Sequence, residues 1–184
     1  QSMRLKKIFT NLVSINEAFD TKFDSIDWNF DGESFVSIAT LGSDEFKLYI
    51  QVKSLDFEGR QLVWLNVAFS RFIDGKETEL LLNMGIQSKQ LGAIISALKA
   101  KIQDITTQYE INAIVFIAIA NEEKRISFYE KLAHSSKLGL HNWRYLATVQ
   151  WPGFRAVVMS EKNLTKDEFQ TLKADFEKRG KSLN

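Results

Sequence analysis

The run at residues 113–120 constrains the fold more than any other stretch of the chain. All eight residues are apolar, and polar side chains do not alternate with them. A run of this length fits a strand better than a helix, and the absence of alternation is typical of a strand that is buried on both faces. Because strands of this kind belong to parallel sheets, we expect a parallel strand in the middle of the protein.

The residues before this run complete a βαβ unit. A short apolar run at 79–86 predicts a strand, and apolar side chains then recur at helical spacing over 91–105. Crossovers between strands of one sheet are right-handed and join parallel strands. We therefore expect strands near 79–86 and 112–120 to be adjacent and parallel, followed by a second helix over 122–132.

The segment upstream of the βαβ unit has the pattern of an antiparallel meander. Strand patterns occur at 33–41, 45–54, 61–72 and from about residue 78. Gly42-Ser43-Asp44 and Asp74-Gly75 supply hairpin turns between them. Two more strands, 144–151 and 154–161, flank Pro152-Gly153, where the turn sequence predicts a bulge or a wide hairpin.

The two ends of the chain are expected to be helical. Residues 4–19 carry apolar side chains at helical spacing, and Thr165-Lys166-Asp167-Glu168 is a capping box that begins a helix to about Arg179. The chain of 184 residues suits a single domain with a sizeable core. We expect one α/β domain of the α+β type over 1–184, with a mixed sheet in the core at 33–162 and helices around it.

Composition excludes several classes of function. The formal net charge of +1 gives no overall field that would attract nucleic acid or a membrane. The absence of cysteine removes disulfides, thiolate nucleophiles and cysteine-based zinc sites. His134 and His141, two histidines seven residues apart, make a poor metal site, so none is expected. Since no apolar run has transmembrane length and no signal peptide is present, we expect a cytoplasmic protein.

The turn at 84–93 has the chemistry of an anion site. A strand, a short polar turn and the start of a helix follow one another there. The first N–H groups of a helix lack intrahelical partners, and the helix dipole favours negative charge at that end. A phosphate-bearing cofactor at 87–93 is one interpretation. A plain strand-to-helix turn is the other, because most such turns bind nothing.

Two motifs give the chain a resemblance to a known family. The first is Gln87-x-x-Gln90-x-Gly92. The second runs from Asn121 through Tyr129 to Leu132 and ends in Phe-Tyr-Glu-Lys-Leu. Over roughly residues 45–162 the chain resembles the GNAT superfamily, the acyl-CoA-dependent N-acyltransferases. That resemblance implies a mixed sheet that is antiparallel at first and parallel in the middle.

The resemblance also implies a cosubstrate, acetyl-CoA, and an amine as acceptor. It assigns contacts with the cofactor to Met84, Gly85, Ile86, Gln87, Ser88, Lys89, Gln90, Leu91, Gly92, Ala93 and Asn121. It makes Tyr129 the acid that protonates the departing CoA thiolate, whereas the residue type and its helix equally suit a core aromatic. Glu79 is the candidate general base, as the single carboxylate on the strand that leads into the turn.

Two functions therefore follow from the sequence. The first is an N-acyltransferase that transfers an acetyl or related acyl group to an amine. The second is a non-catalytic domain of the same fold that serves as a binding or interaction module. Gln90 stands at a position where the family has glycine, and Ala133-His134 replace the family's Gly-Phe, which favours the second. The acceptor is not identified by any motif.

Overall fold

The computed structural model describes residues 23, 26–79, 88–119, 123–135, 142–151, 153–161 and 163–182. These residues form one mixed sheet of eight strands with three helices, so the α+β class is confirmed. The strands are β1 (Asn29–Phe30), β2 (Ser34–Leu41), β3 (Asp44–Phe57), β4 (Arg60–Ile73), β5 (Lys76–Glu79), β6 (Ala113–Ile119), β7 (Trp143–Trp151) and β8 (Phe154–Glu161). The helices are α2 (Ser88–Gln108), α3 (Glu123–His134) and α4 (Lys166–Ser182). The predicted helix at 4–19 lies outside the described residues.

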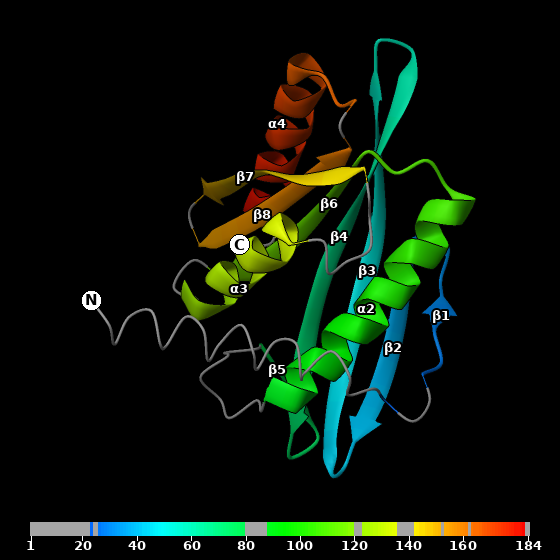
Figure 1. Cartoon of the computed structure of the whole chain (residues 1–184), viewed down its shortest axis with the longest axis vertical. Coiled ribbons are helices and arrows are strands. Elements are labelled where there is room, and N and C mark those ends of the chain that lie inside the picture. Colours follow the sequence, from blue (N-terminus) through cyan, green and yellow to red (C-terminus); the bar gives the residue numbers. More distant parts are fainter. Residues whose placement is uncertain are drawn as a thin grey trace.

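The first half of the sheet is the predicted antiparallel meander. The strand order is β1-β2-β3-β4-β6-β8-β7, and β5 pairs with β4 off this path. Strands β2 to β5 pair in succession and antiparallel. Asp74 and Gly75 turn β4 into β5 with φ angles of 51° and 74°, the left-handed geometry that two-residue hairpins require. Figure 1 shows β3 and β4 as long strands that run most of the length of the molecule.

The parallel pair in the middle of the sheet has a different partner from the one predicted. Strand β6 runs parallel to β4, with residues 64–67 opposite 113–116, and antiparallel to β8 on its other side. The hairpin at Asp74 and Gly75 sends β5 back along β4, so β5 and β6 run in opposite directions. The sequence predicted that a strand at 79–86 is the parallel partner of β6. For Glu79, which belongs to β5, that prediction is wrong. Residues 80–87, the rest of that predicted strand, lie outside the described residues.

Strand β6 is buried on both faces, as its uninterrupted apolar sequence predicts. Ile114 and Phe116 belong to a core cluster that includes side chains of α2 and α3. Ala113 and Val115 belong to a second cluster, which includes side chains of α4. Helices α2 and α3 therefore cover one face of the sheet and α4 covers part of the other (Figure 1).

Helix α4 begins at the predicted capping box. The backbone N–H of Glu168 donates to Thr165 Oγ1 at 3.2 Å, and the N–H of Thr165 donates to Glu168 Oε1 at 3.3 Å. Further along the helix, Phe176 meets Trp64 of β4 edge to face, with ring centroids 4.4 Å apart. The cap therefore starts a helix whose apolar side is fixed against the sheet.

The β7–β8 hairpin is tighter than its turn sequence predicts. Trp151 pairs directly with Phe154, which leaves two residues in the connection. The irregularity lies further along β7, where the register shifts between Tyr145 and Ala147. The bulge is thus located in the strand, away from Pro152-Gly153.

Candidate functional site

Strands β4 and β6 separate in the middle of the sheet. Their ladder ends at Val67 and Phe116, and the pairing of β4 with β5 begins only at Ser70. On the edge of β4 that faces β6 and β5, Ala68 and Phe69 therefore have no paired strand among the described residues. Backbone N–H and C=O groups outside a ladder need other partners, and the carbonyl oxygen of Phe69 has one in Arg125 Nη2 at 2.8 Å.

A cavity of about 420 Å³ lies at this separation. Its apolar wall consists of Ala68, Phe69, Ile117, Ala118 and Phe154. Its polar wall consists of Lys47, Tyr49, Ser70, Glu77 and Arg125. Apolar walls with a few polar groups, at a volume of several hundred cubic ångströms, are the usual composition of a small-molecule site.

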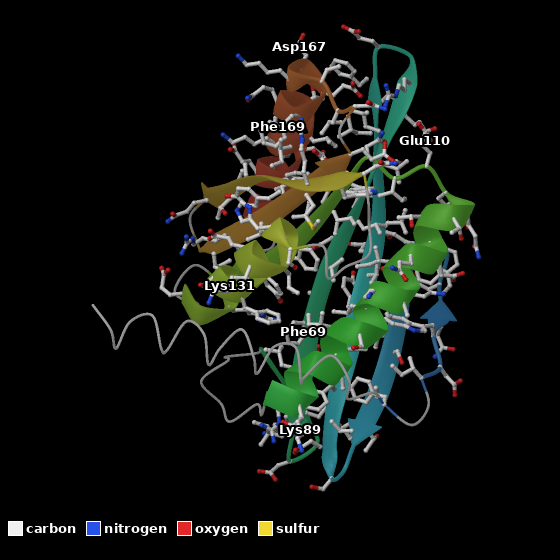
Figure 2. All side chains as sticks on the ribbon, viewed as in Figure 1. Phe69, Lys89, Glu110, Lys131, Asp167 and Phe169 are labelled. Atoms are coloured by element: carbon white, nitrogen blue, oxygen red, sulfur yellow. The ribbon has the colours of Figure 1, made fainter. Side chains whose placement is uncertain are left out.

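The cavity has one side toward α3 and another toward the opposite face of the sheet. Phe69 belongs to the core cluster beneath α2 and α3, so Ala68 and Ser70 point the other way. Lys47 is opposite Ser70 and Tyr49 is opposite Ala68, which places both on that second face. In Figure 2, Phe69 lies between α3 and the end of α2 that Lys89 marks.

Arg125 of α3 is the buried charge of this site. Its side chain is only 4% exposed. Its Nη2 donates to the carbonyl oxygen of Phe69 at 2.8 Å, and its Nε donates to the hydroxyl oxygen of Tyr129 at 2.9 Å. The guanidinium also lies 4.4 Å from the centroid of the Phe69 ring. Arginine keeps its proton in proteins, so this wall of the cavity carries a fixed positive charge.

Tyr129 has features of both of its predicted roles. Its side chain is 0% exposed and stacks on Phe116, with centroids 5.1 Å apart, as expected of a core aromatic. Its hydroxyl oxygen accepts the hydrogen bond from Arg125, which lines the cavity. Among the described residues that form the cavity wall, Tyr129 itself does not occur. Its role as the catalytic acid stays a prediction.

Glu77 is a cavity residue that sequence reasoning missed. The hairpin at Asp74 and Gly75 places it in β5, where Oε1 accepts from Ser70 Oγ at 2.8 Å and Oε2 lies 3.5 Å from Lys47 Nζ. A two-residue turn fixes the register of both strands, so the Asp-Gly pair already contained the signal that could have found Glu77.

Glu79, the predicted base, is the last residue of β5. Its backbone lies opposite Ser70, and its side chain is outside the described part of the structure. Its proposed role is therefore neither supported nor contradicted by a contact. Glu77 is the carboxylate of this strand that the structure places at the cavity.

Gln90 directs its side chain toward Asp44 of β3. It is 7% exposed, and its Nε2 donates to Asp44 Oδ2 at 2.6 Å. Asp44 also accepts from Arg71 Nη2 at 2.7 Å. These hydrogen bonds, from Arg71 first and Gln90 second, lower the pKa of the Asp44 carboxyl from its usual value. Gln90 thus joins α2 to the beginning of β3.

The remaining predicted cofactor residues fall into two groups. Ser88, Lys89, Leu91, Gly92 and Ala93 lie in the first two turns of α2, with Lys89 exposed and Gly92 and Ala93 buried. The first turn of α2 contains no acidic residue, which suits an anion there. Met84, Gly85, Ile86, Gln87 and Asn121 lie outside the described residues, so their roles stay predictions.

No model of a known protein family and no curated protein matches the chain. The fold and the cavity define an α+β protein with a ligand-sized cavity where two parallel strands separate. Within the described ranges, no helix is long and apolar enough to cross a membrane. The same residues contain no group of three or more His, Asp or Glu side chains placed to hold a metal ion.

Proposed function

We propose that the protein is an acyl-CoA-dependent N-acyltransferase whose acyl group occupies the cavity between β4 and β6. The observation that carries this proposal is the position of the cavity at the separation of a parallel strand pair. The strand order supports it, because an antiparallel meander followed by a parallel pair is what the resemblance to the GNAT superfamily implies. The motifs at 87–92 and 121–132 are the residues on which this resemblance rests.

The gap offers the kind of contacts that a CoA arm needs. The arm carries amides, and the edges of β4 and β6 beyond Val67 and Phe116 supply backbone groups outside their mutual ladder, apart from the Phe69 carbonyl, which accepts from Arg125. Helix α2 begins at Ser88, and a helix N-terminus without acidic residues suits a pyrophosphate. In this proposal the pyrophosphate lies at the start of α2 and the thioester lies in the cavity.

The reaction is the direct attack of an amine on the thioester. The amine nitrogen bonds to the carbonyl carbon, the C–S bond breaks, and the thiolate leaves with the electron pair. The nitrogen gives up one proton and the sulfur gains one, so no oxidant or further reactant is needed. Glu77 is the carboxylate placed to take the proton from the amine, since it lines the cavity.

Tyr129 is the proposed donor of the proton to the thiolate. The guanidinium of Arg125, which donates to the phenol oxygen at 2.9 Å, would stabilise the phenolate left after the transfer. A phenol is a reasonable donor because its ordinary pKa of about 10 is close to that of a thiol. Water then restores the proton.

Cofactor binding is the first test. At a hundredfold excess over its dissociation constant, acetyl-CoA should stabilise the folded protein by about 2.7 kcal/mol, which thermal melting measures. Lys89→Glu puts a negative charge into the first turn of α2 and should weaken binding about tenfold. Lys166→Glu makes the same change in the first turn of α4 and should leave binding unaltered. No melting shift at millimolar acetyl-CoA would reject the proposal.

Turnover is the second test. Glu77→Gln and Tyr129→Phe should each lower it by about 10²–10⁴-fold, the usual contribution of general acid–base catalysis. Release of CoA can be followed with a thiol reagent without background from the protein, because the chain contains no cysteine. A panel of amines supplies the acceptor, and slow hydrolysis of the thioester is the fallback reaction.

The alternative function is a non-catalytic domain that binds an acyl-CoA or another ligand. Two observations favour it, namely the engagement of Gln90 with Asp44 and the complete burial of Tyr129. The two functions separate cleanly in the tests above. A melting shift without release of thiol from any acceptor would establish the binding module.

A further inference from the structure

We propose that Ser70 is a positioning residue of this site, whose hydroxyl holds the carboxylate of Glu77 where it takes the proton of the acceptor amine. This inference rests on the proposed acyltransferase function and deepens it, because it assigns a further residue to the same site. It also identifies the face of the sheet from which the acceptor enters.

Strand β5 by itself does not fix the side chain of Glu77. The strand has four residues and, among the described strands, pairs with β4 alone. The Glu77 side chain is 47% exposed, so packing does not select one of its rotamers. A group that takes a proton must be held in position relative to the reacting atoms. An oriented base at this place therefore needs hydrogen bonds from its neighbours.

The register of the sheet places Ser70 within reach of this carboxylate. Glu77 lies opposite Phe72 of β4, and Ser70, which precedes Phe72 by two residues, is its diagonal neighbour on the same face. On the other side of β4, Ser70 lies opposite Lys47 of β3. Lys47, Ser70 and Glu77 thus form a row across three neighbouring strands, and all three line the cavity.

Of the two contacts to the carboxylate, the one from Ser70 holds it more firmly. Ser70 Oγ donates to Glu77 Oε1 at 2.8 Å, a normal hydrogen-bond distance, whereas Lys47 Nζ lies 3.5 Å from Oε2. The serine side chain is also short, while the ammonium of lysine is carried on a flexible stem. A carboxylate has about four lone-pair positions, so these contacts leave room for the proton of an amine.

The proposed base and the proposed acid lie on opposite faces of the sheet. Ser70 and Glu77 point away from α2 and α3, whereas Tyr129 belongs to the core cluster beneath these helices. The acceptor amine therefore enters from the face of Ser70 and gives one proton to Glu77 as its nitrogen bonds to the thioester carbon. The C–S bond breaks, and the sulfur receives one proton from Tyr129 on the α3 side.

Steady-state kinetics of thiol release from acetyl-CoA tests the proposal. Ser70→Ala should lower kcat about tenfold and leave the KM for acetyl-CoA unchanged, because a misplaced base slows the proton transfer but not cofactor binding. Ser70→Thr and Ser70→Val have nearly the same shape and differ in the hydroxyl, so Thr should keep most of the turnover and Val should lose as much as Ala. Ser54→Ala is the control, because Ser54 is an exposed serine of β3 that does not belong to the described cavity wall.

A double variant separates positioning from a structural role. If Ser70 acts through Glu77, adding Ser70→Ala to Glu77→Gln should cost no further turnover. An equal loss in both backgrounds, or equal turnover of the Thr and Val variants, would overturn the positioning role and leave the acyltransferase function standing. Should Ser70→Ala fail to fold, the Thr and Val variants still decide. An unmodified protein that releases no thiol with any amine would overturn the proposed function and this inference with it.

Discussion

At the scale of single residues, the hydroxyl of Tyr129 contributes to stability as well as to the proposed chemistry. It is fully buried and accepts a hydrogen bond from the buried guanidinium of Arg125. Tyr129→Phe removes the acceptor but keeps the ring, so the free energy of unfolding should fall by about 2 kcal/mol in urea denaturation. Tyr109→Phe removes a hydroxyl from a side chain that is 50% exposed and should change stability by less than about 0.5 kcal/mol. Equal effects of the two changes would contradict this assignment.

Asp44 should make stability depend on pH. Its pKa is lowered by hydrogen bonds from Arg71 and Gln90, so the folded protein holds the charged form more strongly than the unfolded chain does. The resulting stability is present above the unfolded pKa, near 3.8, and is lost as the pH falls through the lower folded pKa. Asp44→Asn should cost about 1 kcal/mol at pH 7, given the partial exposure of the pair, and the difference should shrink below about pH 4.

Urea denaturation at pH 7, 5 and 3 measures this dependence. Asp74→Asn is the matched control, since Asp74 is an exposed carboxylate in a turn where asparagine is tolerated. A constant difference between the unmodified protein and Asp44→Asn at all three pH values would show that the carboxylate charge is not what joins α2 to β3.

At the scale of elements, α4 depends on its capping box. Thr165 and Glu168 satisfy each other's backbone N–H groups at the start of this helix. Thr165→Ala should lower the free energy of unfolding by about 1 kcal/mol, because one N–H then loses its partner. Thr165→Ser keeps the hydroxyl and should retain most of the stability. Thermal melting of the two variants measures the difference. Identical melting points would show that the Thr165 hydroxyl does not stabilise α4.

At the scale of the whole molecule, β6 is the centre of the protein. It lies between β4 and β8 and between two core clusters, and residues 113–116 are at most 1% exposed. Its amides should therefore exchange with solvent only on global unfolding, whereas those of β5, which pairs with one strand, should exchange by local opening. Hydrogen exchange measured by mass spectrometry compares the two segments. Faster exchange in β6 than in β5 would contradict this order of stability.

Much of this architecture was predictable because it depends on local sequence. The apolar run at 113–120 predicted a strand buried on both faces, and the structure confirms it for β6. The Asp74-Gly75 turn and the capping box at Thr165 were also correct, since both depend on residues within a few positions of one another. Candidate residues of the site were harder to predict, since Arg125 and Glu77, which line the cavity, are not among those that the sequence indicated.

What the sequence determined by itself, therefore, is helices α2 to α4, the buried strand β6 and the antiparallel meander, which follow from periodicity and turn chemistry. Tertiary structure alone decided which strand is the parallel partner of β6, because that choice depends on contacts between residues about fifty positions apart. The tertiary structure also determined where the cavity lies and which residues line it. Arg125 and Glu77 line this one cavity although they lie on different elements, and no local pattern encodes where two paired strands part.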